Sequence, residues 1–373
     1  MDRTMLGSHS MPEKTIHVVY PHRELPIAPD VIGRHVGAAL SGYARVRFHP
    51  FHQIRCIRPR PGDVLIGHAY PCAWSTLRWS MRQPGWGRRI LLQPFSLDER
   101  EHGHLDALID QCDLFLAITG DHWLSELPHS RFARWAPKIR QLDLGLENSH
   151  FPPIKTRFNP PGQRKLLYIG NDHPGKGLDY LDCIAQMLKT EITWLGPRRS
   201  TSAARYIGLK HHGFMDWSHP QTLQLLAGYD FLVMAGSFDA CPTTVIEALA
   251  WGLLPVCTPT TGYANTPGVV NIPSGDVAAA VAILCDLQNQ PEAALERVRT
   301  AGRLQLSERF KWSRFEALVC DAVHSSASPP LMQTSKSDWA EPYKSQASAC
   351  SAALLRTLLP PGWFQAINPR VRQ

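Results

Sequence analysis

Two carboxylates, Asp239 and Glu247, stand eight positions apart around the expected start of a helix. An apolar strand is predicted to end at Gly236, and the helix to begin at Pro242, whose φ is already set for a first helical position. Free backbone N–H groups in that first turn favour a phosphate. The expected donors are those of Thr243, Thr244 and Val245. An anion cradle beside two hydroxyl-binding carboxylates has the pattern of a nucleotide sugar, a diphosphate between two polyhydroxylated rings.

The same stretch resembles a known family. An acidic residue, seven intervening residues, Glu, small residues and a later Pro-Val are similar to the E-x7-E signature of retaining family 4 glycosyltransferases. The resemblance implies an α/β fold called GT-B, two Rossmann-like doubly wound parallel-sheet domains facing a central cleft. It also implies that Asp239 contacts donor-sugar hydroxyls and stabilises charge at the anomeric carbon, while Glu247 binds the ribose. Asp in place of Glu shortens the reach by one methylene, which leaves the donor sugar open.

A glycine-rich segment, Gly170-Asn-Asp-His-Pro-Gly-Lys-Gly177, follows a predicted strand and opens a helix. It departs from a P-loop because Gly177 stands where a hydroxyl would bind Mg²⁺. By the resemblance, Lys176 matches the lysine that neutralises the donor diphosphate, and Asn171 occupies the place of an arginine. A solvated loop lysine is the alternative for Lys176. Asn171 brings no positive charge, and three cations are candidates to supply it: Arg198, Arg199 or Lys210.

Two further stretches match the place where relatives pack the nucleobase. They are the loop at Gly196-Pro-Arg198 and the segment His212-Gly-Phe214-Met215. By this resemblance, the donor site includes Phe214, Met215 and Arg198. Neither stretch has a distinctive polar pattern, so the identity of the base stays open.

Taken singly, Asp239 and Glu247 have plainer interpretations, a turn aspartate and an exposed helix glutamate. Their position in a strand–loop–helix frame favours a binding site instead.

The first half of the chain offers candidates at the ends of predicted strands, the rim where doubly wound sheets bind ligands. These are His68, Gln93 and Thr119. Arg23 and Gly33, around the first strand–helix loop, complete the acceptor-side set. Relatives place a histidine after the middle strand, near the reacting sugar; Gln93 stands there here, and His68 is the alternative. Because the chain has 17 histidines, a surface or core role competes with catalysis for His68.

Length and composition indicate two α/β domains in a reducing compartment. The chain has 373 residues, 44% hydrophobic and 19% charged, enough for two cores. Nine cysteines without a C-x-x-C pair argue against a disulfide framework or a zinc site. We expect no signal peptide, no membrane span, and a cytoplasmic protein. The absence of Asp-x-Asp predicts metal-independent chemistry with no cofactor beyond the donor itself.

A net charge of +7 and a pI near 9.0 favour an anionic partner. Nucleic acid is the weakest candidate, because no RNA-binding or zinc-finger signature is present. A nucleotide sugar and a glycan or lipid-linked acceptor fit better, with peripheral contact at the inner face of an anionic membrane as an extension. The most basic run, Arg45 to His49 and then Arg55, Arg58 and Arg60, has the alternation of a charged edge strand.

Short apolar strands alternate with helices, which favours parallel sheets with helices on both faces. In the first half we expect strands at 15–20, 45–49, 63–67, 89–92 and 113–118, with helices at 30–40 and 105–110. In the second half we expect strands at 165–169, 191–195, 230–235 and 254–257, with helices at 177–189 and 222–228.

A Pro-rich stretch over 152–162 marks the expected domain boundary. The stretch Lys138 to Pro152 resembles the family's last strand and exit from its first domain, and Arg309 to Glu316 resembles its terminal helix. The predicted organisation is a disordered or tag-like segment 1–13, an acceptor domain 14–155, a donor domain 156–310, a helix 311–324 crossing back to the first domain, and an extension 325–373.

The sequence therefore predicts a retaining glycosyltransferase using a nucleotide diphosphate sugar, in which the leaving phosphate helps remove the acceptor proton. Cell-envelope glycan synthesis is the family-level expectation. Other GT-B activities remain open, namely a nucleotide-sugar epimerase or an inverting transferase with a first-domain base. A degenerate, non-catalytic binding or partner subunit is a further alternative. A Rossmann dehydrogenase is disfavoured because no Gly-x-Gly-x-x-Gly follows the first strand.

Overall fold

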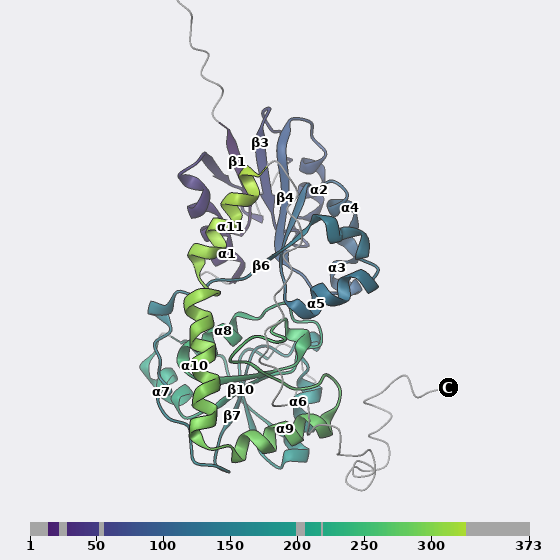
Figure 1. The fold of residues 1–373 in the computed structure, drawn as a ribbon. Helices are drawn as coiled ribbons and strands as arrows, with labels where there is room; N and C mark the ends of the chain where they lie inside the picture. The colour runs from purple at the N-terminus through teal and green to yellow at the C-terminus, as the bar shows by residue number, and fades with distance from the viewer. Residues whose placement is uncertain (1–13, 22–27, 52–55, 199–205, 218, 326–373) are drawn as a thin grey trace, which may run out of the picture. The chain divides into compact units, whose positions relative to one another are not determined.

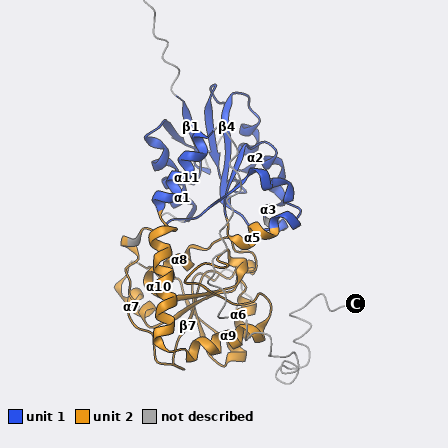
Figure 2. Ribbon diagram, viewed as in Figure 1, with its two compact units in different colours: residues 1–118, 127–145, 312–332 blue, residues 119–126, 146–311, 333–373 orange. Residues whose placement is uncertain are grey.

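The computed structural model describes residues 14–21, 28–51, 56–198, 206–217 and 219–325. The chain divides by its contacts into two compact units, coloured separately in Figure 2. Of the described residues, unit 1 contains those within 14–118, 127–145 and 312–325, and unit 2 contains those within 119–126 and 146–311. The division at 145/146 lies before the expected boundary at 155, and residues 119–126 belong to unit 2 rather than to the first domain. The predicted end segments 1–13 and 325–373 lie outside the described residues, except for Ser325.

Unit 1 contains a six-stranded parallel sheet in the order β2-β1-β3-β4-β5-β6. Its strands are β1 (Thr15–Val19), β2 (Arg45–Phe48), β3 (Asp63–Gly67), β4 (Trp86–Pro94), β5 (Leu114–Ile118) and β6 (Ile139–Leu142). Every residue of β3 and β5 is buried, as expected for apolar central strands. β2 lies at the edge with exposed arginines, which confirms the predicted charged edge strand. The strand order reverses between β1 and β3, so this is the switch point of unit 1.

Helices flank this sheet (Figure 1). They are α1 (Ala28–Ser41), α2 (Trp74–Met81), α3 (Glu99–His102), α4 (Asp106–Ile109) and α11 (Trp312–His324), with 3-10 turns at Gly103–Leu105, Leu127–His129 and Ala133–Lys138. The end of the chain's described part returns to unit 1, since α11 packs against α1. The His35 ring stacks on Trp312 with centroids 3.7 Å apart, and its Nδ1 lies 2.8 Å from Glu316 Oε1.

Unit 2 contains a second six-stranded parallel sheet, in the order β12-β11-β10-β7-β8-β9. Its strands are β7 (Leu166–Ile169), β8 (Ile192–Leu195), β9 (Leu209–Gly213), β10 (Phe231–Met234), β11 (Leu254–Cys257) and β12 (Val270–Asn271). The order reverses between β7 and β10. Because crossovers between parallel strands are right-handed, helices leading to the two sides of this point cover opposite faces of the sheet. The loops after β7 and β10 therefore emerge together at the switch point.

The helices of unit 2 form two packed pairs, α6 with α9 and α8 with α10 (Figure 1). The helices are α5 (Asp121–Glu126), α6 (Leu178–Leu188), α7 (Pro220–Ala227), α8 (Thr243–Trp251), α9 (Val277–Asn289) and α10 (Glu292–Glu308), with 3-10 turns at Asn148–His150, Pro174–Lys176 and Pro259–Thr261. Among the described residues, no helix has the length and apolar character needed to cross a membrane. The predicted strands and helices are present. Sequence reasoning gave no bounds for the helices α2, α3, α5, α9 and α10, and it missed the strands β9 and β12.

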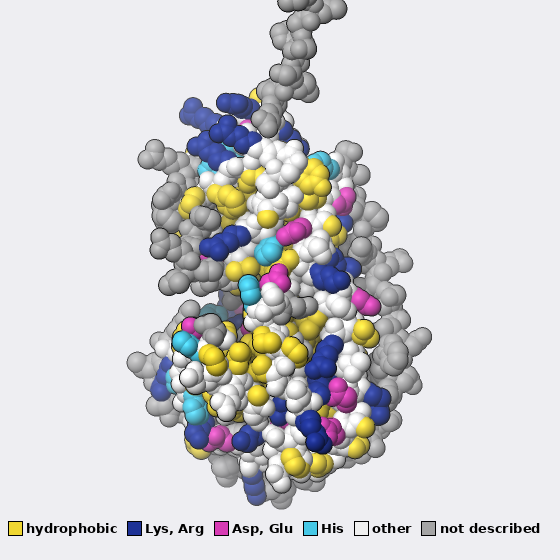
Figure 3. Space-filling model, turned by 90° about the vertical axis from the view of Figure 1, so that its left-hand side faces the viewer, with side chains coloured by type: hydrophobic (Ala, Val, Ile, Leu, Met, Phe, Trp, Pro, Cys, Tyr) yellow, Lys and Arg dark blue, Asp and Glu magenta, His cyan; other side chains and the backbone are white. Residues whose placement is uncertain are grey.

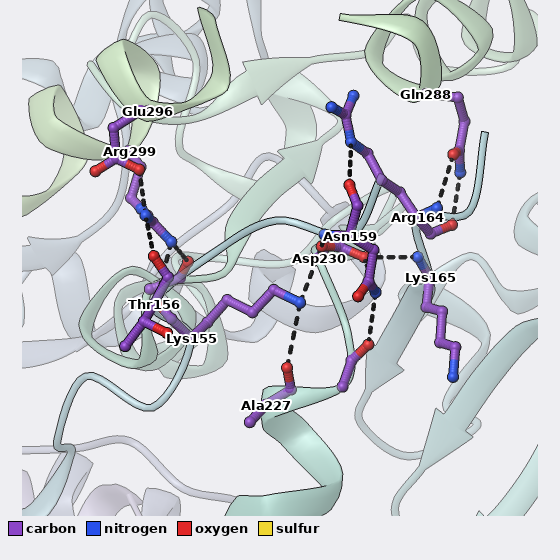
Figure 4. A network of polar contacts seen from close by, with 12 residues as sticks. Lys155, Thr156, Asn159, Arg164, Lys165, Ala227, Asp230, Gln288, Glu296 and Arg299 are labelled. Carbon is purple, nitrogen blue, oxygen red and sulfur yellow. Dashed lines mark hydrogen bonds and ion pairs between the residues drawn. The ribbon is translucent and has the colours of Figure 1, made fainter. Parts of the chain in front are cut away.

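A buried ion pair anchors the Pro-rich stretch to the amino end of the unit 2 sheet. Lys155 and Asp230 are 3% and 0% exposed, and Lys155 Nζ lies 3.0 Å from Asp230 Oδ1. The carboxylate also accepts hydrogen bonds from the backbone N–H groups of Asn159 and Lys165, each at 2.8 Å, and from Asn159 Nδ2 at 2.7 Å (Figure 4). Arg299 donates to the carbonyl groups of Lys155 and Thr156 in the same network. These contacts fix the chain where it enters the sheet.

We predict that Lys155→Met destabilises unit 2 by about 3–5 kcal/mol, because it leaves the Asp230 charge buried without its cation. The three remaining hydrogen bonds to Asp230 place the loss at the lower end of that range. Urea unfolding gives the free energy. Lys165→Met is the control, because the Lys165 side chain is exposed and points away from Asp230 in Figure 4; it should cost less than about 0.5 kcal/mol. Equal losses in the two variants would contradict a role for the pair.

Candidate functional site

Two loops meet at the switch point of unit 2. The lysine loop (residues 170–177) follows β7, and the aspartate loop (residues 235–242) follows β10. The backbone N–H of Ser237 donates to the Gly175 carbonyl at 2.9 Å. Gly177 has φ +72°, and a Cβ there would lie 2.0 Å from the Ala235 carbonyl oxygen, so only glycine permits this approach. The two loops therefore form one continuous surface.

An ion pair joins the two main sequence candidates across these loops. Lys176 Nζ lies 2.6 Å from Asp239 Oδ2, and the side chains are 24% and 12% exposed. The residues are 63 positions apart, so the pairing results from the sheet topology. Each group can still bind a ligand, because an ammonium has three donors and a carboxylate has about four acceptor sites. The structure thus brings the expected diphosphate-binding cation and sugar-binding carboxylate into direct contact.

Asn171 has a turn-forming role in the lysine loop. Its Oδ1 accepts a hydrogen bond from the backbone N–H of His173 at 3.0 Å, and its carbonyl accepts one from the Tyr168 hydroxyl at 2.7 Å. Of the cations suggested to replace the missing charge, Lys210 is paired with Glu191 at 3.6 Å on the outer strands. Arg198 is exposed after β8, and Arg199 lies outside the described residues. No second cation is thereby assigned to the two loops.

The helix α8 begins one residue later than predicted. Pro242 is its N-cap, with φ −57° and ψ 132°, and Thr243 is the first helical residue. The expectation of a free N–H at Val245 is wrong, because this group donates to the Pro242 carbonyl at 3.2 Å. The N–H groups of Thr243 and Thr244 head the helix, where the dipole favours an anion. Thr244 Oγ1 is buried there and has no hydrogen-bond partner among the described residues.

Glu247 lies one turn into α8, on the same face as Thr243. Burial raises the pKa of its carboxyl to about 7, and a hydrogen bond with the Thr243 side chain opposes this only in part. The group is therefore close to half ionised near neutral pH. It can accept hydrogen bonds from hydroxyl groups when ionised and donate one when protonated.

Sequence reasoning missed residues 258–263, which support the aspartate loop through hydrogen bonds. Thr258 and Thr260 donate from their hydroxyl groups to the Gly236 carbonyl at 2.8 and 2.5 Å. The Tyr263 hydroxyl donates to the Pro242 carbonyl at 3.0 Å. The signal was available, because Thr258 follows directly after a predicted strand, at the same rim as the other candidates.

The proposed base-binding residues lie at the far side of the sheet. Phe214 and Met215 follow β9; Phe214 is 74% exposed and Met215 is half-buried. His211 Nε2 lies 2.9 Å from the Gly196 carbonyl, which ties the ends of β8 and β9 together. Phe214 and Arg198 are thus exposed at the carboxyl ends of neighbouring strands, and the structure assigns neither a contact with the two loops.

In unit 1, His68 follows β3 at the switch point, between the rings of Tyr20 and Phe51 at 5.6 and 5.8 Å. Burial lowers the pKa of His68 to about 4, and its buried Nδ1 has no partner among the described residues. A ring held neutral in this way is a weak base at neutral pH. Gln93 Oε1 accepts from the Ala69 N–H at 2.9 Å, so it braces the loop that carries His68.

The other acceptor-side candidates do not form one site among the described residues. Gly33 lies in α1 and packs against β1, since a Cβ there would come within 2.6 Å of Tyr20 Cβ; its place is explained by helix–strand packing. Thr119 is buried in the segment that belongs to unit 2. Arg23 lies outside the described residues. The described residues contain no group of three or more His, Cys, Asp or Glu side chains arranged to hold a metal ion.

No protein-family model matches this chain, and no curated protein matches it by sequence. Solved structures share its fold at low identity. Sucrose-phosphate synthase from Thermosynechococcus elongatus gives a TM-score of 0.61 at 15% identity, over 83% of this chain and 98% of that one. HepE of Anabaena, in complex with UDP and glucose, gives 0.58 at 11% identity, over 83% and 99%. TarM gives 0.55 at 12% identity over 70% of this chain, which spans 55% of TarM.

These similarities show the fold. Two units, each with a parallel six-stranded sheet and flanking helices, make this a GT-B protein, which confirms the predicted fold class.

We predict that Glu247→Gln stabilises the protein at pH 8 but not at pH 4. A folded-state pKa raised to about 7 favours folding below the unfolded value near 4.5, and that contribution disappears as pH rises through 7. The gain at pH 8 should be about 3 kcal/mol, because the two pKa values differ by about 2.5 and each pKa unit corresponds to about 1.4 kcal/mol. Urea unfolding at several pH values measures it, with the exposed Glu308→Gln as control. A gain independent of pH would contradict the assignment.

Proposed function

We propose that this protein transfers a sugar from a nucleotide diphosphate donor to an acceptor, with retention of anomeric configuration. The observation that carries the proposal is the Lys176–Asp239 pair beside the start of α8, at the switch point of unit 2. Doubly wound sheets bind ligands at this position. The GT-B fold shared with sucrose-phosphate synthase and HepE supports a glycosyltransferase, and the UDP and glucose bound by HepE support a nucleotide-sugar donor.

The described residues supply complementary groups for each part of such a donor. Lys176 and the N–H groups of Thr243 and Thr244 would bind the diphosphate, through charge and the helix dipole. Glu247, one turn further along α8, would bind the ribose. Asp239 would accept hydrogen bonds from sugar hydroxyls and stabilise positive charge that develops at the anomeric carbon. The proposal assigns the contacts with the phosphate to these groups, without a metal ion.

Retention is supported by the properties of His68 and Gln93, the two candidates for a general base in unit 1. An inverting transferase needs a general base whose pKa is near the working pH. The pKa of His68 is about 4, and Gln93 cannot take up a proton, so neither residue fits that role. In a retaining reaction the leaving phosphate can remove the acceptor proton, and His68 then serves only to bind or orient the acceptor.

We further propose that the acceptor is a glycan or a lipid-linked glycan, with peripheral contact between unit 1 and an anionic membrane on the cytoplasmic side. Lys and Arg side chains gather at one end of unit 1 in Figure 3. Arg45 and Arg47 on β2, and Arg58 and Arg60 after it, are exposed. Each exposed cation near an anionic surface contributes about 1 kcal/mol.

One observation favours a second candidate, a degenerate GT-B protein that binds a nucleotide or glycan without turnover. Lys176 is already neutralised by Asp239, and Asn171 brings no charge, so the two loops hold less positive charge than a diphosphate would match. The first test must therefore separate binding from turnover.

We expect the wild-type protein to bind one nucleotide sugar selectively when titrated calorimetrically with UDP-, GDP-, ADP- and dTDP-sugars without added metal. Lys176→Met should weaken binding at least tenfold, because a charged hydrogen bond to phosphate is worth about 1.5–3 kcal/mol. Lys165→Met removes an equal charge at the opposite end of β7 and should leave the Kd unchanged. Binding without turnover in any acceptor mixture would support the degenerate candidate. Absence of binding by folded protein would refute a donor site.

We predict that His68→Gln lowers turnover less than tenfold and leaves the pH profile unchanged, since a ring with a pKa of about 4 is not the base. NMR of the product should show the anomeric configuration of the donor. Inversion, or loss of turnover by more than a thousandfold in His68→Gln, would replace the retaining mechanism by an inverting one. His129→Gln, an exposed histidine of unit 1, controls for general effects of losing a histidine.

A further inference from the structure

A short segment interrupts unit 1 and packs within unit 2. The α5 segment (Thr119–Glu126) follows β5 directly, yet its contacts assign it to unit 2, and the chain then returns to unit 1 at Leu127. Within unit 2 it packs against the 3-10 turn Pro259–Thr261. This turn is the one that supports the aspartate loop. The α5 segment therefore contacts part of the candidate site, and no sequence motif predicts this contact.

The first contact of the α5 segment is a close approach of two backbones. A Cβ on Gly120 would lie 1.7 Å from the Gly262 carbonyl oxygen, so any larger residue is excluded without movement of the backbone. Gly262, at φ +88°, is itself in contact with the aspartate loop, since a Cβ there would lie 2.6 Å from Cys241 Sγ. The Cys241 N–H donates to the Thr261 carbonyl at 3.0 Å. Gly120 thus packs against Gly262, and Gly262 packs against Cys241.

Cys241 has an unusual backbone conformation that these backbone contacts help to hold. Its φ is +53°, in the left-handed region, which costs a non-glycine residue roughly 1–2 kcal/mol. Such a conformation persists only where the surroundings fix it. The residue stands between Asp239 and the N-cap Pro242, so its φ sets the direction in which the chain passes from the carboxylate to the helix.

The second contact is an aromatic stack at the other end of the loop. The rings of Trp123 and Phe238 lie 5.9 Å apart with an interplanar angle of 14°. Trp123 is 4% exposed, and its indole N–H has no acceptor among the described residues, so the ring rather than its polar group makes the contact. Phe238 immediately precedes Asp239. Aromatic pairs of this kind contribute about 0.5–1.5 kcal/mol beyond the area they bury.

We propose that the α5 segment is a positioning clamp for Asp239, with Trp123 as its main positioning residue. It holds the aspartate loop on both sides of the carboxylate, through Phe238 and through Gly262 and Cys241. This inference rests on the proposed function for the role of Asp239, but the clamp itself is a property of unit 2. Asp239 has a short side chain, so the position of its carboxylate depends closely on the backbone of the loop.

The test compares Trp123→Ala, which removes the stack, with Trp123→Phe, which keeps an aromatic ring and removes the N–H. Hydrogen exchange of the ligand-free protein, followed by mass spectrometry, reports on residues 237–242 whether or not a donor is known. Trp123→Ala should speed exchange of this loop at least tenfold, and Trp123→Phe should remain within threefold of wild type. Trp79→Ala, an exposed tryptophan in unit 1, should change neither.

Turnover with the donor found in the titration gives the second readout. Trp123→Ala should lower kcat by ten- to a hundredfold with less than a threefold change in the donor KM, because small misplacements of a reacting group have effects of this size. Trp123→Phe should restore most of the rate.

Unchanged exchange and unchanged kcat in Trp123→Ala would overturn the clamp. A kcat as low in Trp123→Phe as in Trp123→Ala would also overturn it, since the indole N–H would then act directly on substrate. If wild-type protein binds no donor, the proposed function fails, and the exchange result still decides whether the clamp exists.

Discussion

The candidate site depends on the junction between two neighbouring parallel strands of the unit 2 sheet, β7 and β10. β7 and β10 are hydrogen-bonded neighbours, but the connections that follow them lead to opposite sides. The lysine and aspartate loops consequently emerge side by side, joined by the Ser237–Gly175 hydrogen bond and by the 2.6 Å ion pair. The start of α8, the support from Thr258 and the α5 segment all act on this junction.

The same junction determines the electrostatics of the site. The charge of Lys176 is balanced by Asp239, so an anionic ligand meets a nearly neutral pair instead of a free cation. In the proposed function, attraction for a diphosphate would come largely from the helix dipole and backbone N–H groups of α8, together with the N–H donors of Lys176 that the carboxylate does not engage. Such an arrangement avoids an unpaired ammonium in a partly buried position, which would otherwise be costly.

Sequence patterns could predict most of the fold, because its strands are short, buried apolar runs. β9 was missed since Lys210, His211 and His212 give it a polar pattern, and β12 since it has two residues. Lys176 and Asp239 were recognised singly from local context. Their pairing could not be predicted, because it joins residues 63 positions apart through strand order. The α5 segment escaped prediction for the same reason, as its contacts with Phe238 and Gly262 span more than 100 positions.

The two carboxyl groups of the site have different surroundings, and this difference favours different roles. Asp239 faces the ammonium group of Lys176 at 2.6 Å and keeps acceptor sites free for a ligand. Glu247 has the Thr243 hydroxyl as its main polar neighbour, and burial raises its pKa to about 7. A diphosphate bound near α8 would raise that pKa further, because a nearby negative charge disfavours ionisation. In the proposed function, Glu247 would then donate a hydrogen bond from its protonated carboxyl to a ribose oxygen, and Asp239 would be the acceptor that faces the anomeric carbon.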